Sequence, residues 1–276
     1  MTAGTGILDK IVAAKRRRLD EAKLLAPLHE VREQAARAPV PIEFGDSLRA
    51  KPGIAVIAEM KRSSPSAGEL DPTLNPAERA QVYSEAGAAA ISVLTEADYF
   101  RGALQDLRDA SEVAHRHGVA VLEKDFVFDE YQVYEARAAG ADAVLLIIAI
   151  LEPSRYRDLF ALAGSLGMDA LVEVFDEAEL DTALTAGPLI VGVNNRNLKT
   201  LKTSLSVFED LSPRIPAGGV KVAESGMKSA SDVERMGRAG AKAVLVGESL
   251  MRAGRAGDDV AALVSAMSSI RVGAGG

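Results

Sequence analysis

The chain contains the sequence AAGADAVLL at residues 138–146, and two similar stretches occur elsewhere, EAGAAAISVL at 85–94 and RAGAKAVLV at 238–246. In each stretch a glycine separates a helix-like segment from a run of apolar, partly β-branched residues. Glycine suits the left-handed residue that commonly ends a helix, and a short apolar run suits a strand that is buried on both faces. The repeated order is therefore helix, glycine, short turn and strand.

The same order can be followed from residue 54 to the end of the chain, and it yields eight predicted strands with a helix after each. The predicted strands occupy residues 54–61, 89–95, 120–126, 143–150, 170–175, 189–194, 220–224 and 243–246. The predicted helices, with apolar residues three and four positions apart, occupy residues 76–85, 104–117, 129–139, 154–166, 176–185, 205–211, 231–239 and 259–270. The 223 residues from position 54 onward give about 28 residues for each strand–helix unit.

Eight such units predict an α/β fold, a parallel (β/α)8 TIM barrel, for which about 250 residues is typical. A doubly wound open sheet is the structural alternative. That fold usually has a glycine-rich dinucleotide-binding turn after its first strand, and the sequence EMKRSS at 59–64 is not such a turn. The barrel is therefore favoured.

The first 50 residues precede the predicted barrel and have helical patterns of their own. Ile7, Ile11 and Leu19 predict an amphipathic helix, and a second, shorter helix begins near Pro27. We expect residues 1–50 to form an N-terminal helical extension packed on the barrel, and residues 51–276 to form the barrel, within a single structural domain. The basic run KRRR at 15–18 favours a solvated helix face, with a basic rim that attracts substrate as the alternative.

Composition excludes several classes of protein. Of 276 residues, 48% are hydrophobic and 26% charged, as in an ordinary globular protein. The absence of cysteine excludes disulfides, thiolate metal sites and a cysteine nucleophile. The net charge is −7 with no basic stripe, no apolar run reaches the roughly 18 residues of a membrane span, and the N-terminus lacks the apolar core of a signal peptide. We therefore expect a cytoplasmic protein that binds neither nucleic acid nor membranes.

Several predicted strands are apolar until their carboxyl ends and then carry charged or polar residues. These residues are Glu59, Lys61, Lys124, Glu173, Asn194, Arg196, Glu224 and Glu248. Active sites of (β/α)8 barrels lie at this end, and a buried charge is costly unless it is paired. A single carboxylate could be a structural salt bridge, but lysines and glutamates on five strand ends favour an active site. Since side chains alternate along a strand, Glu123 and Asp125 would point toward the helices if Lys124 faces the mouth, and we then expect them to form salt bridges with helix residues.

A weaker signal follows the last two predicted strands. Ser225 and Gly226 come after the seventh strand, and Gly247 and Glu248 come after the eighth. Many barrels bind phosphate at these loops through backbone N–H groups. Strand-to-helix turns also carry glycine for steric reasons alone, so both explanations stay open.

The remaining candidates are aromatic residues and histidines. Phe100 and Phe126 follow the second and third strands, where they suit either rim packing or an aromatic wall for a substrate. His115 and His117 are two apart on a predicted helix and so point in different directions, as surface residues do. The sequence has no metal-ligand spacing and no Ser/His/Asp arrangement.

Six short motifs occur in order at the predicted strand ends, and together they carry a family resemblance. They are IAEMKRSSPS at 57–66, LTE at 94–96 followed by YF at 99–100, KDF at 124–126, LVE at 171–173, GVNNR at 192–196 and AESG at 223–226. With these motifs the chain resembles the indole-3-glycerol phosphate synthase family of tryptophan biosynthesis over nearly its whole length. Glu123 departs from the pattern, because the family often has a basic residue there, and its outward face makes altered packing the expected consequence.

The resemblance implies a carboxy-lyase that closes the pyrrole ring of 1-(2-carboxyphenylamino)-1-deoxyribulose 5-phosphate with loss of carbon dioxide and water. It implies that Lys124 is the general acid for ring closure and that Glu173 is the acid/base for dehydration. Lys61 would hold the anthranilate carboxylate, and Glu59 and Asn194 would orient the hydroxyl-bearing chain and the catalytic lysine. The other implied contacts are Ser64, Phe100, Phe126, Arg196 and Leu198 around the pocket, Glu224 near the ribulose, and Ser225, Gly226, Gly247 and the Glu248 backbone at the phosphate. The resemblance implies a small-molecule substrate and calls for no metal or cofactor, and we expect a monomer.

Two alternatives belong to other classes. A phosphoribosylanthranilate isomerase, also a phosphate-binding barrel, would need the cysteine base of its family, and this chain has no cysteine. A catalytically inert barrel that binds a sugar phosphate as a sensor or scaffold would have little chemical reason to keep Lys124 and Glu173 in a buried mouth. The enzyme is therefore the favoured hypothesis.

Overall fold

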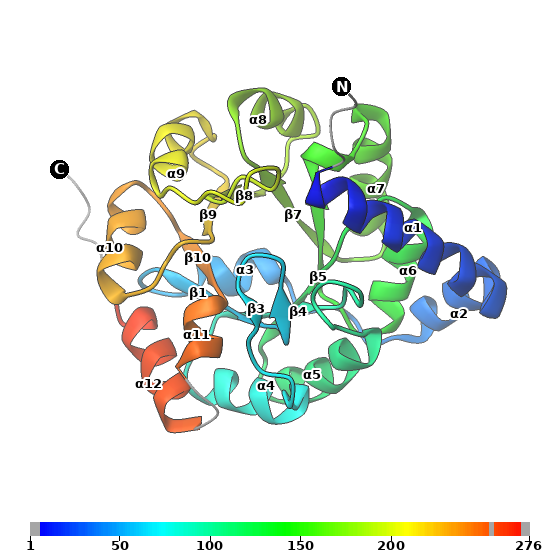
Figure 1. Cartoon of the computed structure of the whole chain (residues 1–276), viewed down its shortest axis with the longest axis horizontal. Coiled ribbons are helices and arrows are strands. Elements are labelled where there is room, and N and C mark those ends of the chain that lie inside the picture. The colour runs from blue at the N-terminus through cyan, green and yellow to red at the C-terminus, as the bar shows by residue number, and fades with distance from the viewer. Residues whose placement is uncertain (1–5, 254–256, 272–276) are drawn as a thin grey trace.

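The structure, a computed structural model, describes residues 6–253 and 257–271, so the glycine-rich C-terminal end that we expect to be frayed lies outside the described residues. Eight parallel strands close into a barrel in the order β1-β10-β9-β8-β7-β6-β5-β4 (Figure 1). Their bounds are β1 Ala55–Met60, β4 Ala90–Leu94, β5 Ala120–Lys124, β6 Ala143–Ile147, β7 Asp169–Val174, β8 Ile190–Asn194, β9 Val220–Glu224 and β10 Ala243–Val246. The predicted (β/α)8 barrel is confirmed.

The eight predicted crossover helices are all present and surround the barrel (Figure 1). They are α4 Pro76–Glu85, α5 Leu104–Arg116, α6 Glu130–Ala138, α7 Pro153–Ser165, α8 Glu177–Leu184, α9 Ser206–Leu211, α10 Ala230–Arg238 and α12 Gly257–Ser268. The glycines of the repeated stretch, Gly87, Gly140 and Gly240, have φ angles of 88°, 92° and 94°. These values are in the left-handed region, which confirms that glycine ends the helix before each of these strands.

Five short elements were not predicted. They are the hairpin strands β2 Ser63–Ser64 and β3 Gly68–Glu69, helices α3 Phe44–Arg49 and α11 Glu248–Arg252, and the 3₁₀ turn Ser212–Arg214. A two-residue strand or a helix of five or six residues is too short to display a period in the sequence. The strand predicted at 143–150 also ends early, because Ile148–Ile150 form a 3₁₀ turn.

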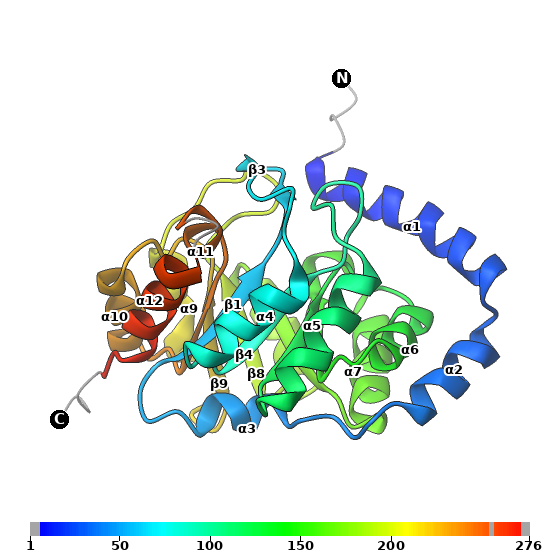
Figure 2. The ribbon, with the colours of Figure 1, turned by 90° about the horizontal axis from the view of Figure 1, so that it is seen from below.

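The first residues form two helices, α1 Ile7–Leu25 and α2 Leu28–Arg37, as predicted. Helix α1 lies along the end of the barrel where the β2–β3 hairpin projects, α2 descends beside α6, and α3 lies at the opposite end (Figure 2). Phe44 and Leu48 of α3 are fully buried in the inner core of the barrel, so this helix covers the amino-terminal end. Within the described residues, no helix is long and apolar enough to cross a membrane.

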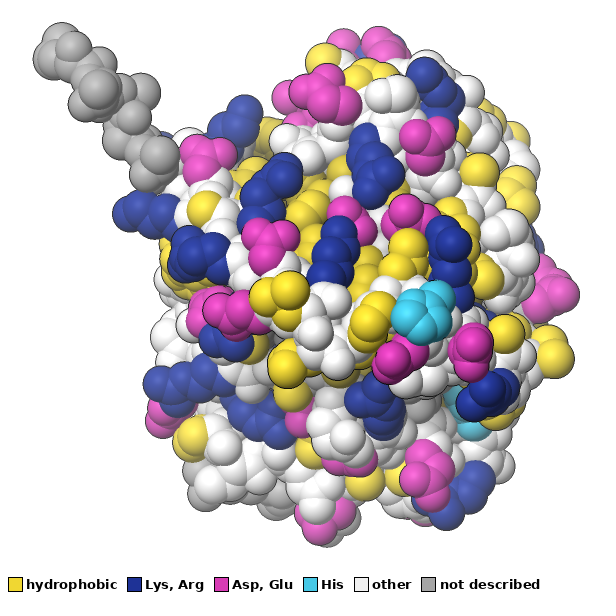
Figure 3. Space-filling model, turned by 90° about the vertical axis from the view of Figure 1, so that its right-hand side faces the viewer, with side chains coloured by type: hydrophobic (Ala, Val, Ile, Leu, Met, Phe, Trp, Pro, Cys, Tyr) yellow, Lys and Arg dark blue, Asp and Glu magenta, His cyan; other side chains and the backbone are white. Residues whose placement is uncertain are grey.

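The basic run at 15–18 is a solvated face in part, because Arg16, Arg17 and Arg18 are exposed but Lys15 is not. Lys15 Nζ lies 2.5 Å from Asp125 Oδ2, and the Lys15 side chain is only 18% exposed. Arg18 forms two hydrogen bonds with the carboxylate of Asp98, of 2.7 and 2.6 Å. On this side of the molecule, basic and acidic side chains are interspersed (Figure 3). Two of the four basic residues therefore attach α1 to loops at the mouth of the barrel.

Candidate active site

Because side chains alternate along a strand, the charged residues at the mouth lie on the same face of their strands as the apolar residues of the inner core. On four strands, an apolar residue packs inside the barrel and the residue two positions later is charged. These pairs are Ile57 and Glu59 on β1, Leu122 and Lys124 on β5, Leu171 and Glu173 on β7, and Val222 and Glu224 on β9. The barrel mouth is therefore built from the carboxyl ends of strands that are far apart in the sequence.

Lys124 lies at the centre of this group. Its Nζ is 3.2 Å from Glu173 Oε2 and 3.2 Å from Glu224 Oε2. Asn194 Nδ2 donates a 3.1 Å hydrogen bond to the other oxygen of Glu173. In the described part of the chain, neither carboxylate oxygen of Glu224 has a hydrogen-bond partner, although the ion-pair distance to Lys124 is short. One lysine is thus shared by two buried carboxylates.

Two further ion pairs lie beside this centre. Lys61 donates a hydrogen bond to Glu59, and both side chains are largely buried. Arg196 Nη2 is 3.5 Å from Glu248 Oε2. The predicted residues Glu59, Lys61, Lys124, Glu173, Asn194 and Glu224 are therefore all joined in close pairs, as expected for side chains that converge on one mouth.

Burial and the neighbouring charges raise the pKa values of Lys124 and Glu224 and lower the pKa of Glu59. Burial alone would lower the pKa of Lys124, but the charges of Glu173, Glu224 and Glu59 outweigh it and hold that pKa above its usual value. Burial raises the pKa of Glu224 to about 8, against the attraction of Lys124. Burial would also raise the pKa of Glu59, but Lys61 and Lys124 hold it below its usual value. The mouth therefore holds a charged ammonium next to a carboxyl group that titrates near neutral pH.

Two glycines make room for the carboxylates. A Cβ atom at Gly192 on β8 would lie 1.9 Å from Glu224 Oε1, and a Cβ at Gly247 would lie 2.2 Å from Glu59 Oε1 and 3.0 Å from Lys61 Nζ. Any side chain at these positions would displace a charged group. Both glycines are thus part of the architecture of the mouth.

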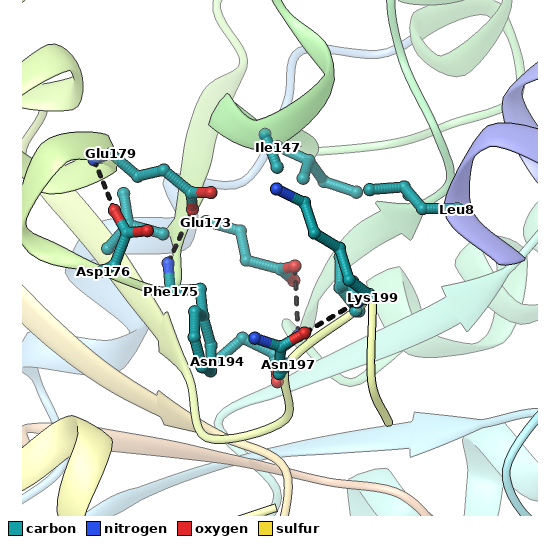
Figure 4. A pocket seen from close by; sticks show the side chains of 12 residues that line it. Leu8, Ile147, Glu173, Phe175, Asp176, Glu179, Asn194, Asn197 and Lys199 are labelled. Carbon is teal, nitrogen blue, oxygen red and sulfur yellow. Dashed lines mark hydrogen bonds between the residues drawn. The ribbon is translucent and has the colours of Figure 1, made fainter. Parts of the chain in front are cut away.

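A pocket opens at the carboxyl ends of β7 and β8 (Figure 4). Glu173, Asn194 and Leu198, all predicted site residues, line it. The other lining residues are Leu8, Ile147, Ala149, Val174, Phe175, Asp176, Glu179, Asn197 and Lys199. None of these nine was predicted. Leu8 comes from α1, and no sequence pattern indicates that the extension reaches the pocket.

The aromatic candidates are neighbours. The ring centroids of Phe100 and Phe126 are 6.2 Å apart, and the rings are tilted by 41°. Ser64, on the hairpin strand β2, accepts a 3.1 Å hydrogen bond from the Ala67 backbone N–H. The β2–β3 hairpin and the loop that carries Phe100 are also joined, because Ser63 Oγ donates to the Tyr99 carbonyl at 2.9 Å.

The phosphate candidates occupy two adjacent loops. Ser225 and Gly226 follow β9 with φ angles of 63° and 91°, and Gly247 is the residue before α11. Ser249 Oγ donates to the Met227 carbonyl at 2.5 Å, which ties the second loop to the first. The predicted residues are thus brought together at one side of the mouth.

The residues that flank Lys124 face outward, as alternation predicts. Asp125 forms the expected salt bridge with a helix, through Lys15 of α1. For Glu123 the expectation of a salt bridge is wrong: Thr95 Oγ1 lies 3.2 Å from one of its oxygens, and the other has no hydrogen-bond partner among the described residues. His115 is not an isolated surface residue either, because its Nε2 is 2.8 Å from Asp142.

Comparisons with known proteins agree with one family. A family model described as indole-3-glycerol phosphate synthase matches residues 8–263. Proteins named indole-3-glycerol phosphate synthase from Mycolicibacterium gilvum and Aromatoleum aromaticum are 47% and 45% identical to this chain. The alignments cover 94% and 93% of this chain, and 94% and 98% of those proteins. A solved structure of tryptophan synthase from M. tuberculosis has a TM-score of 0.63 at 17% identity, covering 83% of this chain and 97% of that one, and this likeness shows the fold alone.

Proposed function

This chain belongs to the indole-3-glycerol phosphate synthase family, and from that premise we propose which of its side chains perform each step. The reaction converts 1-(2-carboxyphenylamino)-1-deoxyribulose 5-phosphate to indole-3-glycerol phosphate, carbon dioxide and water, so the chain is a carboxy-lyase of tryptophan biosynthesis. The ring carbon that bears the carboxylate attacks the ribulose carbonyl carbon, carbon dioxide leaves, and the new hydroxyl group then leaves as water. An acid must be positioned to protonate the carbonyl oxygen during ring closure, and again to protonate the hydroxyl group that leaves as water.

Lys124 is the general acid of ring closure. As the ring carbon attacks, the carbonyl oxygen gains negative charge and takes a proton from the Lys124 ammonium. The observation that carries this proposal is the position of the ammonium, 3.2 Å from both Glu173 and Glu224 in a buried mouth. Because the glutamates hold the pKa of Lys124 above its usual value, the ammonium is charged before substrate binds.

Glu173 is the acid/base of dehydration. Loss of the hydroxyl group as water needs a proton for the departing oxygen and a base for the proton on the neighbouring carbon. Glu173 is suited to exchange both, because one of its oxygens contacts Lys124 and the other accepts a hydrogen bond from Asn194. Asn194 and Glu59 orient these groups and the hydroxyl-bearing chain of the substrate.

The remaining predicted residues bind the substrate. Lys61 holds the anthranilate carboxylate until it leaves as carbon dioxide. Ser64, Phe100, Phe126, Arg196 and Leu198 form the pocket, Glu224 contacts the ribulose, and Ser225, Gly226, Gly247 and the Glu248 backbone bind the phosphate. The left-handed Ser225 and Gly226 and the linked loops after β9 and β10 support the phosphate assignment.

The physiological setting is also part of the proposal. We expect a monomer in the cytoplasm whose partner is the small-molecule substrate and which binds no nucleic acid, since a net charge of −7 disfavours association with a phosphate backbone. Residues 1–50 act as an extension of the barrel at 51–276, in one structural unit. The contact of Lys15 with Asp125 and the presence of Leu8 in the pocket wall support this division.

The role of Lys124 can be tested by fluorescence of the indole product, against a chain that has no tryptophan of its own. We expect Lys124→Ala to lower kcat about 10²–10⁴-fold with the fold retained. Lys221→Ala is the matched control, because that lysine lies on β9 but its Nζ donates to the Ser212 carbonyl at 2.6 Å, away from the mouth. Near-wild-type turnover by Lys124→Ala would show that the acid is another group.

A further inference from the structure

A buried glutamate outside the proposed catalytic set organises the loop that carries Phe100. Glu96 follows β4, and its residue is fully buried. Its Oε1 accepts a 2.9 Å hydrogen bond from the Asp98 backbone N–H, and its Oε2 accepts bonds of 2.7 and 3.0 Å from the backbone N–H groups of Tyr99 and Phe100. Its carbonyl oxygen accepts a further bond of 2.8 Å from the Gly102 N–H. The loop is therefore folded around one carboxylate.

The loop needs such an internal support, because its backbone is strained. Arg101 has a φ of 56°, a conformation that is unfavourable for a residue with a Cβ atom and that persists only where the surroundings enforce it. At the next residue, Gly102, a Cβ would lie 2.0 Å from the Leu94 carbonyl oxygen. The chain thus reverses tightly against the end of β4.

The same loop contacts the substrate pocket of the proposed function. The Phe100 ring lies 6.2 Å from the ring of Phe126, which is two residues after Lys124. The backbone N–H of Ser63, next to the pocket residue Ser64, donates a 3.3 Å hydrogen bond to the Phe100 carbonyl. A change in the loop would therefore move both an aromatic ring and the start of the hairpin β2–β3.

We propose that Glu96 is a positioning residue that holds Phe100 against Phe126 and thereby sets the aromatic wall of the substrate pocket. This inference rests on the proposed function, in which both rings contact the substrate. Glu96 does not touch the reacting atoms itself. It acts through the backbone N–H groups of residues 98–100, so its removal should affect substrate binding more than the chemical step.

A carboxylate is required at this position, because both of its oxygens accept from backbone donors. Glutamine keeps the size of the side chain but replaces one oxygen with an NH2 group, which would face an N–H donor. Aspartate keeps two acceptor oxygens on a shorter side chain. The order of function is therefore expected to be Glu, then Asp, then Gln.

The experiment measures KM, kcat and thermal stability for Glu96→Gln and Glu96→Asp beside a matched control. The control is Asp142→Asn, since Asp142 is also a buried carboxylate that accepts two backbone N–H bonds, but at the amino-terminal end of the barrel. We expect Glu96→Gln to raise KM by about tenfold or more with a smaller change in kcat, and Glu96→Asp to recover part of this loss. Asp142→Asn should lower stability while it leaves KM and kcat within about twofold of wild type.

A double-mutant cycle with Phe100→Ala separates this inference from the proposed function. If Glu96 acts through Phe100, the KM of the double variant should equal that of Phe100→Ala alone. Independent, multiplying effects on KM, or a loss of stability without a change in KM for both Glu96 variants, would overturn the inference. If Phe100→Ala itself leaves KM unchanged, the substrate wall of the proposed function is wrong instead.

Discussion

Buried carboxylates occur at both ends of the barrel, but their hydrogen bonding differs. At the amino-terminal end, the buried Asp142 accepts backbone bonds from Ile42 and Val121 at 2.8 and 2.7 Å and contacts His115, and the half-buried Asp169 accepts one from Gly45 at 2.8 Å. At the carboxyl-terminal mouth, Glu173 and Glu224 share the single ammonium of Lys124, and Glu224 has no hydrogen bond within the described residues.

This difference separates stability from function. A buried acceptor that meets backbone donors stabilises the fold, whereas a buried charge with too few partners costs stability. The carboxylates at the amino-terminal end join α3 and its preceding linker to the strands. At the other end Glu96 also accepts backbone bonds, but Glu173 and Glu224 retain acceptor capacity and negative charge that a substrate with protons to exchange can use. The mouth is therefore expected to respond to substitution in rate, and the opposite end in stability.

The largest expected effect is on turnover at the mouth. Glu173→Gln keeps the side-chain volume but removes the negative charge beside Lys124 and the base for dehydration, so we expect kcat to fall about 10²–10⁴-fold. The measurement is product fluorescence at saturating substrate, with thermal unfolding to show that the fold is retained. Glu179→Gln is the control, because that side chain lines the same pocket but caps the Phe175 N–H, a bond that an amide oxygen can keep. Equal losses in the two variants would argue against a specific role for Glu173.

The second prediction tests whether the space around Glu224 matters. Gly192→Ala places a methyl group where the Glu224 carboxylate now lies, so the carboxylate must leave its position beside the β8 backbone, and its 3.2 Å contact with Lys124 is disturbed. We expect kcat/KM to fall about 10- to 100-fold, as displacements of about 1 Å at reacting groups do. Gly164→Ala in α7 is the control, since a Cβ there meets no atom within 4 Å. Full activity of Gly192→Ala would mean that Glu224 need not stay beside Lys124.

Sequence patterns predicted the mouth better than its surroundings, for a physical reason. Alternation within one strand is a local property, so it predicts that Glu123 and Asp125 face away from Lys124. Leu8 and Lys15 reach the mouth through packing of α1 on the barrel, and the partner of Lys15 is 110 residues away. No local pattern reports such a pairing, although the exposure of Arg16, Arg17 and Arg18 follows from the sequence.

The third prediction concerns the amino-terminal end. Asp142→Asn replaces one acceptor oxygen with an NH2 group opposite a buried backbone N–H, so we expect a loss of about 1–3 kcal/mol in the free energy of unfolding. Denaturant titration would measure it, with kcat within about twofold of wild type. Asp169→Asn should cost less, because Asp169 accepts a bond from one backbone group rather than two. A drop in kcat with unchanged stability would remove the distinction between the two ends.

The smallest effect on turnover is expected at Glu123, which lies next to Lys124 in sequence but on the outer face. Burial and the nearby Asp125 raise the pKa of Glu123 to about 8, against the attraction of Lys15 and with a further contribution from Glu135. The unfolded chain releases this proton near pH 4.3. Between these values the folded chain binds more protons than the unfolded chain, so stability falls as the pH rises through this window.

The side chain of Glu123→Gln cannot ionise. The free energy of unfolding of this variant, relative to that of wild type, should therefore increase as the pH rises from about 4.5 to 8, and this gain should then stay constant. Below about pH 4.5 the gain should vanish, because Glu123 is then protonated in both the folded and the unfolded chain. The difference between the two denaturation curves isolates Glu123, because Glu224, whose pKa is also raised to about 8, is present in both proteins. Parallel curves across this range would mean that Glu123 is already ionised at low pH in the folded chain. A loss of kcat in Glu123→Gln would show instead that the outer face of β5 is coupled to the mouth. Effects on rate would then distinguish the two ends of the barrel, but not the inner and outer faces of its strands.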